Sequence, residues 1–448
     1  MIPARWKQFS SGTLNRRIFS AAVLVGALTF ATKIVALGKE MLSAAAFGAD
    51  DAMDAFLSAF LLPTYALNVL AVQMNTTLIP VFVGVREKEG PVAAQRLFSG
   101  VLVLSIAVLG IATLLLAIAA PALFPLLFSK FSPEKLQFTI RLFYLLLPSI
   151  LISGLVNNCE GALNAGEKFA MAALAPAVVP LATMAAIWTL APRWGVHSLV
   201  AGLVAGMILQ LAIVAASLKR RGLSFTPRWH GMDENLRRLI SQYLPVVAAS
   251  AMMCSSFLID QSMAAMLPPG SVSVLTYGNK LVSLVLTMGT IALGTAVLPY
   301  FSKMAAAADW TALRHTLKTY IWIIVLVTVP LTAAGIFFSK PLTALMYQRG
   351  EFTAADTALV APVQAMLLLQ LPFYSLSILF VRMISSLEAN RLMMWGTVIS
   401  VVVNITLNYV LMQFMGVAGI ALSTSVVYAV SAAYLGVMLW RKLNAVSR

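Results

Sequence analysis

The sequence predicts an all-α protein that crosses a membrane many times, with about twelve helices in two six-helix lobes around a central cavity. Of its 448 residues, 60% are hydrophobic and only 10% are charged, and the mean hydropathy is +0.90. Soluble domains usually have about a quarter of their residues charged. Apolar runs of about 20 residues recur along the chain, and each is long enough to cross a bilayer core. The alternating segments of about 10 residues that are typical of membrane β-barrels do not occur in the sequence.

Twelve membrane helices are expected in chain order. Their ranges are 19–46, 54–84, 97–127, 137–163, 169–191, 196–218, 238–267, 273–302, 317–338, 357–386, 392–414 and 417–440. The basic amino-terminal segment resembles a signal peptide. However, its apolar run is too long and no small-residue cleavage site follows, so we expect a retained first helix. Pro63 and Pro245 are expected to bend their helices.

Loop charges predict the orientation of these helices. With the amino terminus inside, 21 of the 31 Lys and Arg residues fall in cytoplasmic segments, and five fall on the opposite side. Short cytoplasmic loops of membrane proteins carry an excess of Lys and Arg. The split therefore predicts a multi-pass protein with an even number of helices and both termini in the cytoplasm.

The two halves of the chain resemble each other. LIPVF at 78–82 matches VLPYF at 297–301, and LNAGEKF at 163–169 matches LEANRLM at 387–393, at offsets of 219 and 224 residues. A repeat of six helices, an even number, gives two parallel copies with a cavity between them. The predicted lobes are residues 1–219 and 220–448.

Several function classes are not expected from the sequence. It has no GxxxxGK[ST] or HExxH motif, and its three histidines are scattered, so we expect no enzyme, no metal site and no cofactor. The net charge of +15 comes mostly from loops, so nucleic acid is not an expected partner. Cys159 and Cys254 are interpreted as two buried free thiols, although a disulfide between them is not excluded.

Charged residues in the first helix mark the first candidate site. Lys33, Lys39 and Glu40 lie in an apolar run, where a charge costs about 3 kcal/mol. Lys33 and Glu40 are seven residues apart and so share a helix face. A cation facing a cavity suits an anionic ligand such as phosphate. The alternative is that Lys39 and Glu40 reach the outer water.

Three more charged residues belong to the predicted site. Asp54 begins the second helix, where it can cap free N–H groups or pair with Lys39 in a closed outer gate. Lys280 in the eighth helix is either a cavity cation or the partner of Asp260 in the seventh. By contrast, Asn404 and Asn408 in the eleventh helix fit hydrogen bonds between helices.

Three segments carry a family resemblance. These are KIVALGKE (33–40) with the following AAAFGADDAMDAFLSAF, then GSVSVLTYGNKLVSLVLTMGTIALGTAVLPYFSK (270–303), and LMYQRGEFTAAD (345–356). They resemble the MviN/MurJ family of lipid II flippases, which belongs to the multidrug/oligosaccharidyl-lipid/polysaccharide exporter superfamily. The resemblance covers essentially the whole chain. Within the family, the chain resembles a shorter member with twelve helices. The resemblance implies a V-shaped, two-lobed transporter of the bacterial inner (plasma) membrane that works by alternating access.

The resemblance also implies roles for the candidate residues. Lys33, Lys39 and Lys280 stand where arginine is usual and would attract the diphosphate of a polyprenyl-linked saccharide. Glu40 stands where aspartate is usual, and Asp54 matches the family directly. The expected protein is a monomeric flippase that moves a lipid-linked glycan between leaflets, with a possible coupling ion. The alternatives are a cation-coupled exporter of small molecules and a non-transporting scaffold for envelope synthesis.

Overall fold

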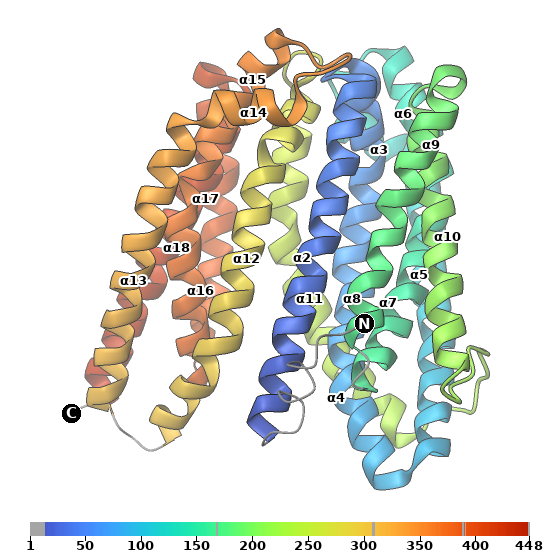
Figure 1. The fold of residues 1–448 in the computed structure, drawn as a ribbon, viewed down its shortest axis with the longest axis vertical. Helices are drawn as coiled ribbons and strands as arrows, with labels where there is room; N and C mark the ends of the chain where they lie inside the picture. The colour runs from blue at the N-terminus through green and yellow to red at the C-terminus, as the bar shows by residue number, and fades with distance from the viewer. Residues whose placement is uncertain (1–13, 167–168, 307–309, 388, 390, 447–448) are drawn as a thin grey trace, which may run out of the picture. The chain divides into compact units, whose positions relative to one another are not determined.

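A computed structural model describes residues 14–166, 169–306, 310–387, 389 and 391–446 (Figure 1). Every regular element in these ranges is a helix. The first half of the chain contains α2 (Leu14–Phe47), α3 (Asp51–Ala66), η1 (Leu67–Ala71), α4 (Val72–Glu89), α5 (Pro91–Leu127), α6 (Pro133–Leu146), α7 (Pro148–Ala165), α8 (Phe169–Leu174), η2 (Ala175–Ala177), α9 (Val178–Trp194) and α10 (His197–Lys219).

The second half of the chain is helical in the same way. It contains α11 (Glu234–Ala264), α12 (Ser271–Ala306), α13 (Trp310–Phe337), α14 (Ser339–Tyr347), α15 (Ala354–Leu368), α16 (Gln370–Ser386), α17 (Arg391–Met415) and α18 (Val417–Val446). Residues 220–233 between α10 and α11 form a long loop, which is also the most basic loop of the sequence.

The structure confirms the predicted all-α membrane fold. Ten helical segments of the described chain are long and apolar enough to cross a membrane. The other two predicted spans are α2, with 34 residues, and α12, with 36 residues, and these are the helices that carry Lys33 and Lys280. The short helix α14 was not predicted. Its nine residues are too few to cross a bilayer.

Prolines interrupt several of the long helices. Pro63 lies inside α3, and the π-helical turn η1 begins four residues later. Proline has no N–H for the i−4 carbonyl, so a helix next to it is often bent or widened. Pro148 begins α7, where the fourth span divides into α6 and α7, and Pro176 lies in the 3-10 turn between α8 and α9.

The chain forms two compact units. Unit 1 comprises residues 1–43, 59–123 and 138–250, and unit 2 comprises residues 44–58, 124–137 and 251–448. In unit 1, α9 packs on α10 and α4 packs on α7, around a core that contains Phe82 and Phe98. In unit 2, α17 packs on α18 and α12 packs on α15 and α16, with Phe301 in the core.

Two short segments of the first half belong to unit 2. Residues 44–58 cover the turn between α2 and α3, and residues 124–137 connect α5 to α6. The division into lobes at residues 219 and 220 stays a prediction. Both cysteines are free thiols, with Cys159 buried in unit 1 and Cys254 half-buried in unit 2.

Candidate functional site

Helix α2 presents its charges in two different environments. Lys33 is exposed, and no ion pair or hydrogen bond joins its side chain to the described part of the chain. Next to it, Thr32 is buried and its hydroxyl donates to the Leu28 carbonyl at 3.0 Å and the Ala173 carbonyl at 2.9 Å. The Thr32 bond anchors α2 on α8 and leaves the Lys33 ammonium projecting from an apolar helix.

Lys39 and Glu40 pair with each other. The Lys39 ammonium donates to Glu40 Oε1 at 2.7 Å, and Glu40 is only 8% exposed. About one turn farther on, the Ser43 hydroxyl donates to the Lys39 carbonyl at 2.8 Å. Lys33 and Glu40 share a helix face, but Lys33 is open to its surroundings whereas Glu40 is covered. Lys33 is therefore the more available cation of the two lysines in α2.

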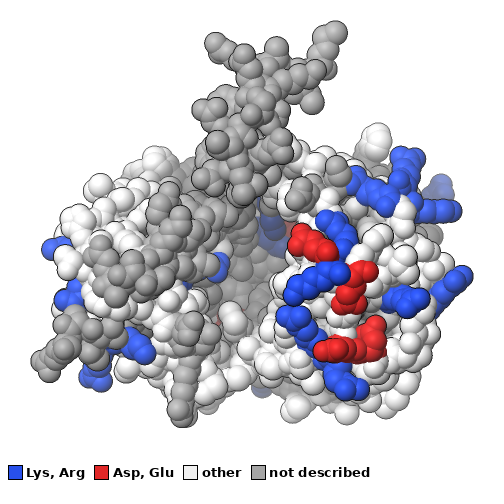
Figure 2. All heavy atoms as spheres, turned by 90° about the horizontal axis from the view of Figure 1, so that it is seen from below, with Lys and Arg blue, Asp and Glu red and all other residues white. Residues whose placement is uncertain are grey.

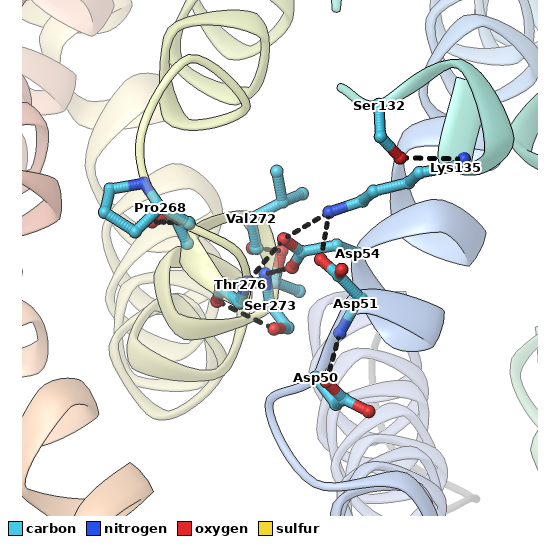
Figure 3. A network of polar contacts seen from close by, with 11 residues as sticks. Asp50, Asp51, Asp54, Ser132, Lys135, Pro268, Val272, Ser273 and Thr276 are labelled. Carbon is cyan, nitrogen blue, oxygen red and sulfur yellow. Dashed lines mark hydrogen bonds and ion pairs between the residues drawn. The ribbon is translucent and has the colours of Figure 1, made fainter. Parts of the chain in front are cut away.

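Asp54 lies at the centre of a polar cluster in unit 2, which we call the latch and define as Asp51, Asp54, Lys135, Gly270 and Ser273 (Figure 3). The carboxylate of Asp54 is 2% exposed. Its two oxygens accept hydrogen bonds from the backbone N–H groups of Gly270 and Ser273, both at 2.8 Å. Asp54 therefore caps the beginning of α12, a helix more than 200 residues away in the sequence.

The remaining latch contact is an ion pair with Lys135. The Lys135 ammonium lies 2.6 Å from Asp51 Oδ1 and 3.3 Å from Asp54 Oδ2, and its side chain is 11% exposed. The same ammonium lies 4.0 Å from the centre of the Phe131 ring, which adds a cation–π contact. The free N–H groups and positive dipole end of α12 stabilise the buried carboxylate from the other side.

The pairing of Asp54 with Lys39 in a closed outer gate stays a prediction, because each residue has a different partner in this structure. Lys39 pairs with the neighbouring Glu40, and Asp54 pairs with Lys135. Lys135 was not predicted as a site residue, because its sequence position indicates only a loop residue beside a helix start. Asp54 is indeed at a helix start, but it caps α12 instead of its own helix.

Close backbone packing surrounds the latch. Gly48 follows the last residue of α2 with φ +60°, and Gly270 precedes the first residue of α12 with φ +88°. A Cβ on Gly270 would lie 2.5 Å from the Ala49 carbonyl oxygen. Gly350, in the loop after α14, also has φ +60° and lies against the Ala45 carbonyl. Glycine is required here because a side chain would collide with a neighbouring backbone.

A second polar cluster surrounds Asp260 on α11. Asp260 Oδ1 accepts from Asn404 Nδ2 at 2.9 Å and from Asn408 Nδ2 at 2.6 Å. Its Oδ2 accepts from the Thr424 hydroxyl on α18 at 3.2 Å. The Asn bonds confirm the prediction of hydrogen bonds between helices. Among the described residues no ion pair includes Asp260, so the alternative of a pair with Lys280 does not form.

Two amide oxygens of the Asp260 cluster have no partner. Asn404 is 1% exposed and Asn408 is fully buried, yet neither Oδ1 atom accepts a hydrogen bond. A buried polar atom without a partner costs about 1–3 kcal/mol. Asp260 also forms part of the wall of a cavity of about 460 Å³ within unit 2, lined by α11, α12, α15, α16 and α18. Thr424 was not predicted, because threonine is common in apolar helices.

Unit 1 also contains a partly buried carboxylate, Glu160, which the sequence suggests as a residue lining the inner mouth, and that role stays a prediction. Glu160 on α7 accepts a hydrogen bond from Gln210 Nε2 on α10 at 2.9 Å. Gln210 is 7% exposed. No group of three or more His, Cys, Asp or Glu side chains in the described residues is placed to hold a metal ion.

Comparisons with known proteins identify the family. The family model described as "Lipid II flippase MurJ" matches residues 43–447. A curated "Probable lipid II flippase MurJ" of Synechocystis sp. is 27% identical over 98% of this chain and 84% of its own length. The one of Rhizobium tropici is also 27% identical, over 94% of this chain and 80% of its own length.

Solved structures match the fold. "Lipid II flippase MurJ, inward closed conformation" has a TM-score of 0.78 at 22% identity, covering 93% of this chain and 87% of that chain. An inward-facing multidrug resistance MATE family transporter of the MOP superfamily has the same TM-score at 13% identity, covering 95% and 99%. At these identities both matches support the fold alone.

The family match confirms several predictions at once. It places the chain among multi-pass transporters of the bacterial inner membrane, and it supports a transporter over an enzyme. The exporter of small molecules is not favoured, because the family model and the curated relatives all name a lipid II flippase. The match extends over most of the described chain, and the chain therefore belongs to the MurJ family of lipid II flippases.

Proposed function

We propose that this chain moves lipid II across the bacterial inner membrane by alternating access and that lysines attract the diphosphate of the substrate. The exposed ammonium of Lys33 carries this proposal. Lys33 lies 14 residues before the end of α2, which is about 21 Å along the helix axis. A cation at that depth is costly in lipid and is retained where it meets a polar substrate.

The other charged residues have distinct proposed roles. Lys39 adds positive charge one to two turns along α2, with Glu40 holding its ammonium in place. Lys280 in unit 2 supplies a third cation, from α12. Lysine presents a compact point charge to phosphate, so three lysines suit a diphosphate without requiring one fixed geometry.

The orientation follows from the distribution of charge. Arg86, Lys88, Arg96 and most basic residues of the loop between α10 and α11 are exposed. Figure 2 shows Lys and Arg side chains, with several Asp and Glu among them, on the face seen from below Figure 1. Positive charge of this kind favours the cytoplasmic side. We therefore infer that both termini are cytoplasmic and that the latch lies on the outer side. The protein is proposed to act as a monomer with lobes 1–219 and 220–448.

The latch is proposed to close the outer exit. Its contacts join residues 44–58 and 124–137, from the first half of the chain, to the beginning of α12. An exit at this place opens only if Asp54 leaves the N–H groups of Gly270 and Ser273. Those N–H groups then need another partner, such as water, because unpaired polar groups are costly.

The Asp260 cluster is proposed to bind a monovalent coupling cation. An Asn side chain can turn by half a rotation and exchange its Oδ1 and Nδ2 positions. If Asn404 and Asn408 turn, their two orphaned oxygens face the Asp260 carboxylate and complete a set of oxygen ligands with Thr424. A single carboxylate balances one positive charge, which favours a monovalent over a divalent cation.

Reconstituted proteoliposomes test the flippase proposal. Lipid II carrying a fluorophore on its headgroup is placed in both leaflets, and the fraction accessible from outside is followed over time. We expect transport by the wild-type protein and a strong loss in the Lys33→Ala, Lys280→Ala double variant. The exposed Lys340 on α14 provides a control, because Lys340→Ala removes one lysine outside the proposed site. Unchanged transport in the double variant would contradict the proposed roles.

A further inference from the structure

The side chains that line the cavity beside Asp260 differ in kind from the three lysines, Lys33, Lys39 and Lys280, that are proposed to attract the diphosphate. We propose that this cavity binds the saccharide of the lipid-linked substrate, an inference that rests on the flippase function proposed above. The cavity lies wholly within unit 2 and has a volume of about 460 Å³, within the 300–1,000 Å³ typical of ligand sites. Nothing in the family match assigns it a ligand.

The lining residues recur at helical spacing. On α11 the cavity is lined by residues 253, 256, 257, 260 and 261, and on α12 by residues 275, 279, 283, 286, 287 and 290. Spacings of three and four residues place side chains on one face of a helix. Two long helices therefore each turn a continuous face to the same cavity, and α16 and α18 contribute Tyr374 and Tyr428.

Ten of the 16 residues that line the cavity are neutral and polar, and five are apolar. Among its described lining residues, Asp260 is the single charged one, and the others include Ser, Thr, Asn, Gln and Tyr. Hydroxyl and amide groups both donate and accept hydrogen bonds, and this suits the many hydroxyls of a sugar. A diphosphate, by contrast, needs cations. The composition therefore fits the uncharged part of the headgroup.

Two amide side chains in the cavity wall have hydrogen-bonding atoms that a ligand could use. Gln261 is 6% exposed, and its Oε1 has no hydrogen-bond partner, whereas its Nε2 lies at 3.4 Å from the Thr276 hydroxyl. The Asn279 side chain makes no hydrogen bond with the described part of the chain. A buried unpaired amide oxygen is costly unless something binds it. Sugar hydroxyls would supply the missing donors.

An aromatic pair completes the wall. Tyr374 and Tyr428 meet edge to face, with ring centres 5.1 Å apart. The Tyr374 hydroxyl lies 3.3 Å from the Thr290 hydroxyl, which fixes the ring. Rigid tyrosines offer an apolar face and a polar tip at low conformational cost, and a sugar ring likewise has an apolar face edged by hydroxyls.

The position of the cavity matches the covalent structure of the substrate. In a polyprenyl-diphosphate saccharide the first sugar is bonded directly to the diphosphate, so the two binding regions must be adjacent. Lys280, the proposed diphosphate cation of unit 2, follows the lining residue Asn279 in α12. The hydroxyl of Ser283, another lining residue, donates to the Lys280 carbonyl at 2.9 Å. Lys280 is therefore close to the cavity along α12, and a diphosphate bound by its ammonium would bring the first sugar near the cavity.

Binding of two lipids in nanodiscs separates the sugar from the diphosphate. The probes are lipid II and undecaprenyl diphosphate, which has no saccharide. We expect Asn279→Leu to weaken lipid II binding about tenfold, equivalent to about 1.4 kcal/mol, and to change undecaprenyl diphosphate binding by less than about twofold. Tyr374→Phe keeps the ring and tests the hydroxyl in the same way. Tyr409→Phe on the exposed face of α17 is the matched control. Melting temperatures show whether each variant is folded.

The outcomes distinguish the cavity from the flippase function. If the wild type binds both lipids and the cavity variants weaken both equally, or neither, the saccharide assignment is overturned and the flippase proposal stands. If the wild type binds neither lipid, the flippase proposal fails and the saccharide assignment fails with it. Selective loss of lipid II binding supports the assignment. A cavity that serves only as a water path to Asp260 predicts no selectivity between the two lipids.

Discussion

The carboxylate of Asp54 in α3 accepts the backbone N–H of Ser273 in the first turn of α12 at 2.8 Å. The two residues are 219 residues apart in the chain. The N–H groups at the beginning of α12 are thus capped by a residue of α3 and not by a residue next to α12 in the sequence. The positive charge of Lys135 lies on the opposite side of the Asp54 carboxylate. The beginning of α12 is therefore held by the side chain of a residue that is distant in the sequence.

Removing this carboxylate should loosen the beginning of α12. In Asp54→Ala the N–H groups of Gly270 and Ser273 lose their acceptor, and Lys135 loses one ion partner while it keeps the half-exposed Asp51. Breaking a buried pair on one side costs about 3–5 kcal/mol. We expect faster hydrogen–deuterium exchange in the peptide 268–276, measured by mass spectrometry in detergent.

Asp50→Ala is the control for this measurement. Asp50 is exposed, and its carboxylate accepts only the N–H of Asp51. The same substitution there should leave exchange in 268–276 unchanged. Equal acceleration in both variants would mean that Asp54 does not hold α12.

The packing at Gly350 predicts a large effect from a single methyl group. Gly350 has φ +60° and lies against the Ala45 carbonyl, which also accepts the N–H of Glu351 at 2.9 Å. Gly350→Ala should therefore lower the melting temperature, through strain in the left-handed conformation and a collision with backbone. The strain of the left-handed conformation costs about 1–2 kcal/mol. The collision with backbone costs about 1–3 kcal/mol.

Gly222→Ala separates the two effects. Gly222 has φ +79°, but no heavy atom lies within 4 Å of an added Cβ. This variant should show the conformational strain alone. Similar losses of melting temperature in Gly222→Ala and Gly350→Ala would show that the contact with Ala45 does not matter.

The helices of this chain are predictable from sequence because their cause is local. A membrane helix needs a run of about 20 apolar residues, and such runs are visible without knowledge of neighbours. Pro63, next to η1, was predicted as a point of bending, whereas Pro148, at the division between α6 and α7, was not. Pro245, the other predicted point, lies inside α11, which continues through it. The exact break at η1 cannot be read, because several nearby residues could absorb the effect of Pro63.

The partners of the charged side chains are not predictable in the same way. Asp54 has an obvious sequence neighbour in Lys39, yet its partner is Lys135, which the chain path brings from the α5–α6 connection. Similarly, Lys280 is the nearest cation to Asp260 in sequence, but Asp260 binds Asn404, Asn408 and Thr424. Both choices depend on tertiary packing.

The π-helical turn η1 is expected to depend on Tyr243. The Tyr243 hydroxyl donates to the Leu70 carbonyl at 3.0 Å, and the Ser250 hydroxyl reaches the Val69 carbonyl at 3.3 Å. Tyr243→Phe leaves the Leu70 carbonyl without this donor. We expect a loss of about 1 kcal/mol of stability, measured as a lower melting temperature in detergent.

Tyr144→Phe is the matched control for this prediction. The Tyr144 hydroxyl also donates to a helix carbonyl, that of Ala117 at 3.1 Å, but this residue is 42% exposed. The bond at an exposed site is expected to contribute less, so Tyr144→Phe should have the smaller effect. The reverse order would contradict a supporting role of Tyr243 at η1.

Sodium dependence tests the proposed cation at Asp260. Transport in proteoliposomes should be faster with sodium outside than with potassium at the same ionic strength. Asp260→Asn keeps the shape of the side chain but removes its charge, so the cation loses its only anionic ligand in the cluster. We expect Asp260→Asn to transport at one rate in both salts, and Asp50→Asn, an exposed control, to keep the difference. A wild-type rate that is equal in the two salts but changes with a proton gradient would instead assign the Asp260 carboxylate to proton binding.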